Sequence, residues 1–436
     1  MKQVNLLTDS PRRLFFHYLG PTIGSSMVTS IYILADTIMV GQGVGDAGLA
    51  ALTIFMPIVA SFFALGLLLG VGGGVLMSVA KGSGNESLAH KYFSTAMISA
   101  AVVSVCFAVF GAIFFDQMMY ALGADTTNIE LVRGYGLCYT VSAPLFIFSS
   151  SLQSFIRNDK SPRHAMIAVL TGSGLNILLD YLFIFVFKMG MFGASFATSI
   201  GTSITVCILV IHFFTKKNTM RFSFRFFSIK ALWEIAKCGF SSFLIECANA
   251  VLVFVFNHTL LKYIGSVGVT VYSIMSNVAV VCMSLFNGVT LAAQPIIATN
   301  HGADNHKRVL QVRHIGTITS SVIAVIIFCV GFFFPDLLIY SYVKGPTPEI
   351  LELARYALRI YFFAYLFMNF NIFFSGYFQS TLRPVAAITI QILRSLLLSS
   401  VLVSVLPMIF GADAIWYAVP VTECITFFVA MAFLFF

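Results

Sequence analysis

Long apolar runs separated by short polar segments fill this chain. A helix needs about 20 residues to cross the hydrocarbon core of a bilayer, and twelve runs have this length. They cover residues 14–40, 49–80, 92–115, 130–156, 163–187, 191–214, 233–262, 268–299, 309–334, 351–379, 384–410 and 413–436. The pattern predicts an all-α membrane protein with twelve transmembrane helices.

The composition supports the membrane class. Hydrophobic residues make up 59% of the chain and charged residues 10%, whereas about a quarter of an average soluble domain is charged. The first apolar run exceeds the 7 to 15 residues of a cleavable signal, so we expect it to be a span and its own insertion signal. The eight cysteines contain no CxxC pair, which predicts neither a disulfide framework nor a metal site.

Basic residues gather on one side of the predicted topology. With the N-terminus in the cytoplasm, eighteen Lys and Arg residues fall on the cytoplasmic side: Lys2, Arg12, Arg13, Lys81, Lys91, Arg157, Lys160, Arg163, Lys216, Lys217, Arg221, Arg225, Lys230, Lys237, Lys307, Arg308, Arg313 and Arg383. Only six fall outside: Arg133, Lys188, Lys262, Lys344, Arg355 and Arg359. This bias predicts a multi-pass protein of the plasma membrane with both termini in the cytoplasm. The net charge of +8 is then explained by loops that face anionic lipid, not by nucleic acid.

The two halves of the chain are similar to each other. Residues 44–48 align with 264–268, and residues 80–85 with 300–305, both at an offset of 220. The basic stretch from Lys216 to Lys237 separates two groups of six spans. An even number of helices per half makes the repeats parallel, an arrangement found in transporters.

We therefore expect three segments. Residues 1–215 form an N-terminal six-helix lobe, 216–232 a cytoplasmic linker, and 233–436 a C-terminal six-helix lobe.

Two carboxylates lie within the predicted spans of the first half. Asp36 is in the first span and Asp180 in the fifth, one helical turn after Asn176 on the same face. At 1.5 Å per residue, Asp36, Asp180 and Thr198 reach comparable depths in the outer half of the bilayer. An ionisable residue at such depth is costly and indicates function. The group predicts a site for H⁺ or Na⁺, and the alternative is that the two acids only form hydrogen bonds between helices.

Several segments carry a family resemblance. Residues 35–41, 175–185 and 193–198 resemble signatures of the multidrug and toxic compound extrusion (MATE) family. Gln294-Pro295, followed by residues 300–303, resembles the signature at the end of its eighth helix. The similarity covers essentially the whole chain and implies a MATE-like fold of two six-helix lobes.

The resemblance also implies residue roles. In this family the matching residues form a cation site in the N-terminal lobe, here Asp36, Asn176, Asp180 and Thr198, with Na⁺ as one possible occupant. A proline that matches Pro21 is associated with bending of the first helix. Tyr135 resembles a tyrosine that reaches the first-helix Asp, and the alternative is an aromatic residue of the membrane interface.

The second half departs from this pattern. By the repeat, Asp36 aligns with Val255 and Asp180 with Leu402, so no second copy of the site is expected. Glu246 resembles a Glu of the sodium-coupled branch, but the Asp that accompanies it there is missing, and only Asn369 and Asn371 are comparable.

The remaining charges of the second half allow two interpretations. Glu246 could attract a cationic substrate or pair with Arg394, the single cation counted inside the spans. Arg394 could also be a structural partner of Glu423.

The expected function is secondary antiport: export of amphipathic organic cations and multiple drugs across the plasma membrane in exchange for H⁺ or Na⁺. The chain has no Walker sequence, so ATP is not the expected energy source. We expect no enzyme activity and no cofactor, membrane lipid as the surroundings, no nucleic-acid partner, and a monomer. A Met- and Phe-rich cavity would adapt to varied apolar cations.

Two alternatives stay open. One is a flippase for lipid-linked or polyanionic substrates of the same superfamily, which would need more cations within the membrane. The other is an intramembrane enzyme, for which the spans offer no nucleophile, base or metal-ligand set.

Overall fold

The computed structural model describes residues 4–343 and 345–435, with the backbone alone at 249 and 250. Within these ranges the chain is helical and contains no strand. Eleven helices are long and apolar enough to cross a membrane. A twelfth span is formed if α5 (Ile129–Val141) and α6 (Ala143–Asn158), bent by 52° between them, cross together. The prediction of an all-α protein with twelve spans is confirmed.

Besides α5 and α6, the first half contains five long α-helices and one short helix, α4. They are α1 (Pro11–Gly43), α2 (Asp46–Gly82), α3 (Glu86–Ile113), α4 (Phe115–Ala121), α7 (Pro162–Asp180) and α8 (Gly190–Ile211). A π-helix, η1 (Tyr181–Val186), extends α7. Two 3₁₀ turns follow α8: η2 (His212–Phe214) and η3 (Phe224–Phe226).

The second half repeats this order. Its helices are α9 (Ile229–Tyr263), α10 (Ser266–Gly302), α11 (His306–Phe333), α12 (Pro335–Tyr342), α13 (Pro348–Ser380), α14 (Pro384–Ile392), α15 (Leu398–Phe410) and α16 (Ala418–Phe435). The π-helix η4 (Leu393–Leu397) joins α14 to α15, and the 3₁₀ turn η5 (Ala412–Tyr417) precedes α16.

The repeat extends to the details of the helix ends. Helices α2 and α10 both have 37 residues, and α3 and α11 both have 28. Both long helices start after a glycine with positive φ, 87° at Gly45 and 84° at Gly265, a conformation that other residues rarely adopt. Asn85 and Asn305 cap α3 and α11 through the same side-chain hydrogen bond. The two halves are therefore built by the same local rules, while the lobe boundaries at 215/216 and 232/233 stay a prediction.

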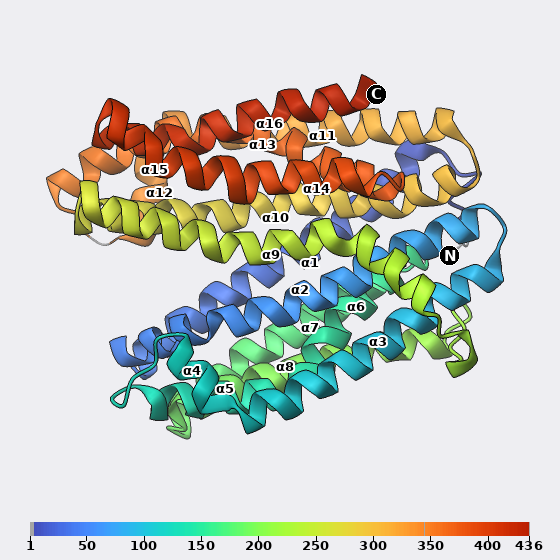
Figure 1. The fold of residues 1–436 in the computed structure, drawn as a ribbon, viewed down its shortest axis with the longest axis horizontal. Helices are drawn as coiled ribbons and strands as arrows, with labels where there is room; N and C mark the ends of the chain where they lie inside the picture. Colours follow the sequence, from blue (N-terminus) through green and yellow to red (C-terminus); the bar gives the residue numbers. More distant parts are fainter. Residues whose placement is uncertain (1–3, 344, 436) are drawn as a thin grey trace.

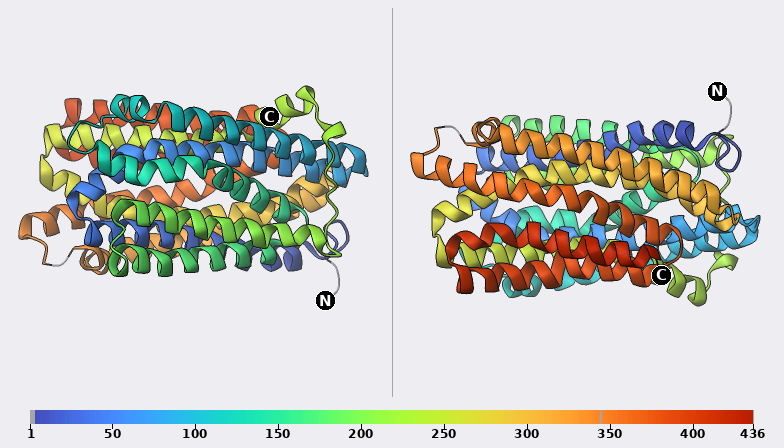
Figure 2. Two further views of the ribbon diagram at one scale, coloured as in Figure 1. Left: turned by 90° about the horizontal axis from the view of Figure 1, so that it is seen from below. Right: turned by 90° about the horizontal axis from the view of Figure 1, so that it is seen from above.

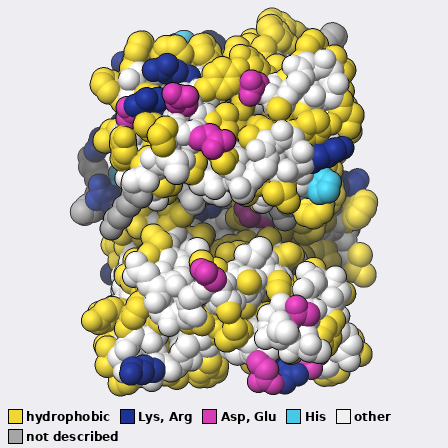
Figure 3. Space-filling view, turned by 90° about the vertical axis from the view of Figure 1, so that its left-hand side faces the viewer, with side chains coloured by type: hydrophobic (Ala, Val, Ile, Leu, Met, Phe, Trp, Pro, Cys, Tyr) yellow, Lys and Arg dark blue, Asp and Glu magenta, His cyan; other side chains and the backbone are white. Residues whose placement is uncertain are grey.

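The two halves lie side by side and separate toward one end (Figure 1). Helices α1 and α2 of the first half pack against α10 and α9 of the second. Both ends of the chain lie on the side of the segment that joins α8 to α9, which we call the linker end (Figure 2). Seen from the opposite end, a hollow runs between the halves (Figure 3). Many large apolar side chains are exposed on the outer surface, for example Phe110, Phe254 and Phe410, as expected for helices in lipid.

Glycines bring the halves together near the linker end. A Cβ placed on Gly239 of α9 would lie 2.0 Å from the carbonyl oxygen of Leu68 on α2. Gly302 of α10 is equally close to the carbonyl of Val79, and Gly82 of α2 to that of Thr299. Such backbone contact is possible only where the side chain is missing. The halves are therefore closed against each other at this end and open at the other.

The linker segment is tied to the first half by a buried ionic cluster. Asp159, in the turn after α6, accepts hydrogen bonds from Lys81 Nζ at 2.6 Å, His212 Nε2 at 2.9 Å and the backbone N–H of Thr219 at 3.0 Å. Burial alone would raise the pKa of Asp159, but the hydrogen bonds from His212 and Lys81 outweigh it and hold the pKa below its usual value. The carboxylate is thus charged at neutral pH and fixes the start of the linker.

The glycine contacts lead to a first prediction. We expect Gly302→Ala to lower the thermal melting temperature of the purified protein, because the new methyl group would force α2 away at a cost of about 1–3 kcal/mol. Gly174→Ala in α7 is the control, since a Cβ there meets nothing within 4 Å. Equal melting temperatures of the two variants would contradict the role given to this contact.

Candidate functional site

Three neighbouring helices bring the predicted cation-site residues together. Helix α1 carries Asp36, α7 carries Asn176 and Asp180, and α8 carries Thr198. Helix α7 packs between the other two. All four residues are buried, with Asp180 completely so and Asp36 8% exposed. Asn176 Nδ2 donates a hydrogen bond to Thr198 Oγ1 at 3.2 Å.

The acceptor atoms of this site lack donors. Among the described residues, Asp36 Oδ1, Asn176 Oδ1 and both carboxylate oxygens of Asp180 are buried without a hydrogen-bond partner. Buried polar atoms are nearly always paired, because an unpaired one loses its water without compensation. A group of unpaired carboxylate and amide oxygens is the arrangement that a cation or a proton would complete. These residues therefore fit a bound H⁺ or Na⁺.

The backbone next to Asp180 is unusual. The α-helical pattern of α7 ends at Asp180, and the following turn, η1, is a π-helix. Such turns are rare and occur frequently at functional sites. The amino-acid pattern does not predict this turn, because Tyr181 to Val186 is an ordinary apolar stretch.

Tyr135 and Pro21 occupy different surroundings. Tyr135 is buried and packs edge to face on Phe55, with ring centroids 5.7 Å apart. No hydrogen bond joins it to Asp36 within the described chain. Pro21 lies inside the continuous helix α1. The next residue, Thr22, donates a hydrogen bond to the carbonyl of Gly288 on α10 at 2.8 Å, so α1 is attached to the second half close to its proline.

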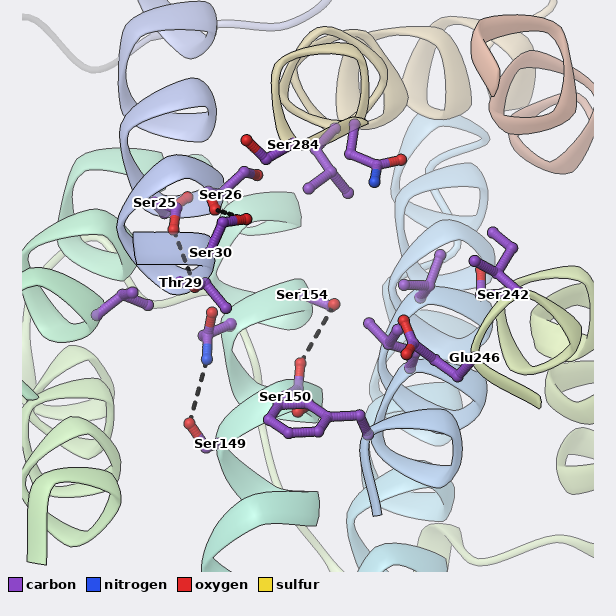
Figure 4. Close-up of a pocket in the computed structure, with 18 of the residues that line it drawn as sticks. Ser25, Ser26, Thr29, Ser30, Ser149, Ser150, Ser154, Ser242, Glu246 and Ser284 are labelled. Carbon is purple, nitrogen blue, oxygen red and sulfur yellow. Dashed lines mark hydrogen bonds between the residues drawn. The ribbon is translucent and has the colours of Figure 1, made fainter. Parts of the chain in front are cut away.

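A cavity of about 420 Å³ lies between the halves, within the usual size range of small-molecule sites. Hydroxyl groups line much of it, as shown in Figure 4 by Ser25, Ser26, Thr29 and Ser30 of α1, Ser149, Ser150 and Ser154 of α6, Ser242 of α9 and Ser284 of α10. Aromatic and sulfur-containing residues contribute only Tyr32, Phe63, Phe146 and Met283. The cavity is therefore not rich in Met and Phe: the helix faces between the halves carry serine, threonine and amides, and most phenylalanines lie elsewhere.

The cation site and the cavity share a wall. Asn176 and Thr198 line the cavity, whereas Asp36 and Asp180 do not. The carboxylates thus lie behind two polar residues that a molecule in the cavity would touch.

Glu246 of α9 is a second acidic residue of interest. It lines the cavity, and its carboxylate forms no ion pair with any described residue. It points toward the space between the halves in Figure 4. Of the two interpretations of Glu246, a contact with a cationic molecule agrees with this position, while pairing with Arg394 is not observed.

Arg394 is paired elsewhere. Its Nη2 and Nε lie 2.7 and 3.1 Å from Glu423 Oε1. Asn371 Nδ2 donates to Glu423 Oε2 at 2.7 Å. Arg394 and Glu423 are both buried, and a buried pair of this kind requires both partners. Arg394 is thus the partner of Glu423 in the second half.

The other two candidates of the second half make local contacts. Asn369 Nδ2 donates to the carbonyls of Tyr365 and Leu366 in its own helix. Gln294 lines the cavity and donates to Gln379 Oε1 at 3.3 Å. Gln294 is therefore in reach of a molecule in the cavity, whereas Asn369 does not line it.

The structure shows the surroundings of one residue that was counted only by its side of the membrane. Arg157, one of the basic residues expected on the cytoplasmic side, is only 7% exposed and lines the cavity. Helix α6 packs against α2 and α3, and Ser78 of α2 donates a hydrogen bond to Asn158, the residue after Arg157, so the end of α6 is buried. Arg394 is consequently not the only cation within the membrane domain. Hydrophobicity gave no signal for this, because Arg157 stands at the polar end of an apolar run.

Comparisons with known proteins identify the family of this chain. The family model MatE matches residues 21–182 and 238–405. The "Multidrug export protein MepA" of Staphylococcus haemolyticus is 25% identical over 421 residues, which cover 96% of this chain and 92% of that protein.

Solved structures show the same fold. A structure described as the outward-facing conformation of a multidrug resistance MATE family transporter of the MOP superfamily has a TM-score of 0.93 at 21% identity, covering 99% of this chain and 97% of the other. A MOP superfamily transporter from Pyrococcus furiosus, whose title reports a reversed polarity of the binding pocket, has a TM-score of 0.91 at 22% identity and the same coverage.

The matched regions include both halves of the repeat, Asp36, Asn176 and Asp180 of the cation site, and most of the helices that line the cavity, whereas α8 with Thr198 lies between them. The chain therefore belongs to the MatE family and is a multi-pass membrane transporter, not an enzyme.

Proposed function

We propose that this protein is a secondary antiporter that exports amphipathic organic cations, including multiple drugs, in exchange for H⁺ or Na⁺. The observation that carries the proposal is the group of unpaired buried oxygens on Asp36, Asn176 and Asp180. The printed name of the staphylococcal relative, a multidrug export protein, supports drugs as substrates.

The cation site would supply the energy. Two buried carboxylates without donors repel each other unless a proton or a metal ion lies between them. Binding of either ion would satisfy the oxygens of Asp36 and Asp180, so the site has a strong preference for the occupied state. An ion gradient across the membrane could therefore load and unload it.

The shared wall suggests how the ion would affect the substrate. Asn176 and Thr198 touch the cavity on one side and belong to the cation group on the other. When the ion binds to the amide oxygen of Asn176, the polar groups that this residue presents to a molecule in the cavity change. Coupling arises if the two states differ in affinity for the substrate.

Helix α1 would carry this change to the second half. Its outer part holds Asp36 against α7, and near Pro21 it is fastened to α10 through Thr22 and Gly288. Proline removes one backbone hydrogen bond and weakens the helix at that point. We infer that a shift of α1 at Asp36 is transmitted across the interface between the halves.

The cavity suits cations. Glu246 offers an unpaired carboxylate, the many hydroxyl groups offer acceptors, and Tyr32, Phe63 and Phe146 offer aromatic faces. The chain contains both halves of the cavity, so a monomer in the plasma membrane would suffice. With the linker end in the cytoplasm, as the basic residues predict, the hollow opens outward (Figure 3).

Our second prediction concerns Asp180. We expect Asp180→Asn to lower ion-driven export of a fluorescent lipophilic cation from proteoliposomes by about tenfold or more, the usual size of a coupling effect. The same variant should have a higher melting temperature, because an amide can donate to oxygens that now lack partners. The measurements are initial export rates and thermal unfolding.

Asp413→Asn, an exposed residue of η5 near the end opposite the linker, serves as the control. Export by Asp180→Asn at the wild-type rate would contradict the assignment of the cation site.

Our third prediction separates the ions. A pH gradient and a Na⁺ gradient are imposed one at a time on proteoliposomes that contain the wild-type protein. One of the two gradients should drive export, and Asp36→Asn should abolish that response because one of the two carboxylates becomes neutral. If neither gradient moved an organic cation through the wild type, antiport would be refuted.

A further inference from the structure

Arg157 is a buried cation that the proposed function does not use. It lies in the last turn of α6, is 7% exposed, and lines the cavity between the halves. Its guanidinium donates one hydrogen bond, from Nη2 to Ser154 Oγ at 3.1 Å. Ser154 is labelled in Figure 4, on the cavity side of α6.

No carboxylate neutralises Arg157. All 17 Asp and Glu residues of the chain lie in the described ranges, and none of their oxygens is within 4.0 Å of its guanidinium. Asp159, two residues away, is occupied by Lys81, His212 and Thr219. Arg394, the other buried arginine that lines the cavity, is fully paired with Glu423. Arg394 thus has a counter-charge within the protein, and Arg157 has none among the described residues.

The free donors of Arg157 face the cavity. A guanidinium has five N–H groups in a planar fork that fits a carboxylate or a phosphate. None of its nitrogens is among the buried atoms without a partner, so the unpaired N–H groups are those that the cavity reaches. An isolated charge in such a place is costly unless an anion joins it.

We propose that Arg157, with Ser154, forms an anion-accepting subsite at the linker end of the cavity, which takes the carboxylate or phosphate group of an amphiphile. The inference rests on the proposed function, since it concerns the same cavity. Glu246, on the facing helix α9, carries the opposite free charge, and the two do not form an ion pair. The cavity therefore presents separated positive and negative groups, which match a molecule that carries both a cation and an anion.

The test uses two dyes that differ only in their anion. Rhodamine B has a delocalised cation and a free benzoate, and its ethyl ester has the same cation with the benzoate capped. Binding of each dye to the purified full-length protein is measured by fluorescence anisotropy. We expect the wild type to prefer rhodamine B, and Arg157→Gln to weaken its binding by about 10- to 100-fold, the size of a lost hydrogen bond to a charged group. Binding of the ester should change little.

Two further variants complete the set. Arg157→Lys should restore part of the preference, because the charge returns without the planar fork. Arg225→Gln, in the exposed linker, should behave like the wild type.

The outcomes distinguish the two proposals. The subsite is overturned if the wild type binds the ester as tightly as rhodamine B. It is also overturned if Arg157→Gln elutes as a single species but binds both dyes equally weakly. Either result leaves cation recognition intact. If the Arg157→Gln variant does not elute as a single species, the subsite is tested by the preference of the wild type for rhodamine B and by the binding of both dyes to Arg157→Lys. Binding of neither dye to the wild type overturns both proposals.

A last comparison identifies the source of the anion. The wild type is placed in nanodiscs of phosphatidylcholine with and without phosphatidylglycerol. Weaker binding of rhodamine B with phosphatidylglycerol, absent in Arg157→Gln, would show that a lipid phosphate occupies the subsite. Equal binding would show that the anionic lipid does not compete and that the carboxylate of rhodamine B keeps the subsite. Either result supports the subsite.

Discussion

The burial of two carboxylates in a low-dielectric region, with three of their oxygens lacking a hydrogen-bond partner among the described residues, is the constraint on which the rest of this structure depends. Asp36 and Asp180 come from helices α1 and α7, and among the described residues Asp36 Oδ1 and both oxygens of Asp180 are buried without a hydrogen-bond partner. A fold gains nothing in stability from such an arrangement, since paired or apolar residues would be cheaper. The arrangement makes sense if an ion from outside the chain completes it for part of the transport cycle.

The surrounding structure places this site where it can act. Asn176 and Thr198 form a thin polar wall between the carboxylates and the cavity. Helix α1 reaches from the site in the first half to α10 in the second. The glycines at the linker end allow the halves to meet backbone to backbone, and contacts of this kind can separate without breaking ion pairs. The site, the cavity and the interface between the halves are therefore joined by shared residues and by helix α1.

The two arginines of the cavity show how the same residue type serves different purposes. Arg394 is fixed by Glu423 and Asn371 within the second half, so its charge is balanced inside the protein. Arg157 has one hydroxyl partner and free donors toward the cavity. Arg157 and the unpaired Glu246 make this cavity polar. A site that bound only apolar cations would not require an arginine.

The sequence by itself determined the membrane class, the twelve spans, the internal repeat and the helices that carry Asp36, Asn176, Asp180 and Thr198. These features follow from local rules, because apolar length, helical periodicity and the capping residues Gly45 and Asn85 act over neighbouring residues. Only the tertiary structure decided that Arg157 is buried in the cavity, that Arg394 pairs with Glu423, and that Glu246 is unpaired. Whether a charge is buried or paired depends on helices far apart in the chain, so no local pattern could reveal it. The hydroxyl-rich lining has the same origin, since the packing of the two halves alone selects which face of each helix meets the cavity.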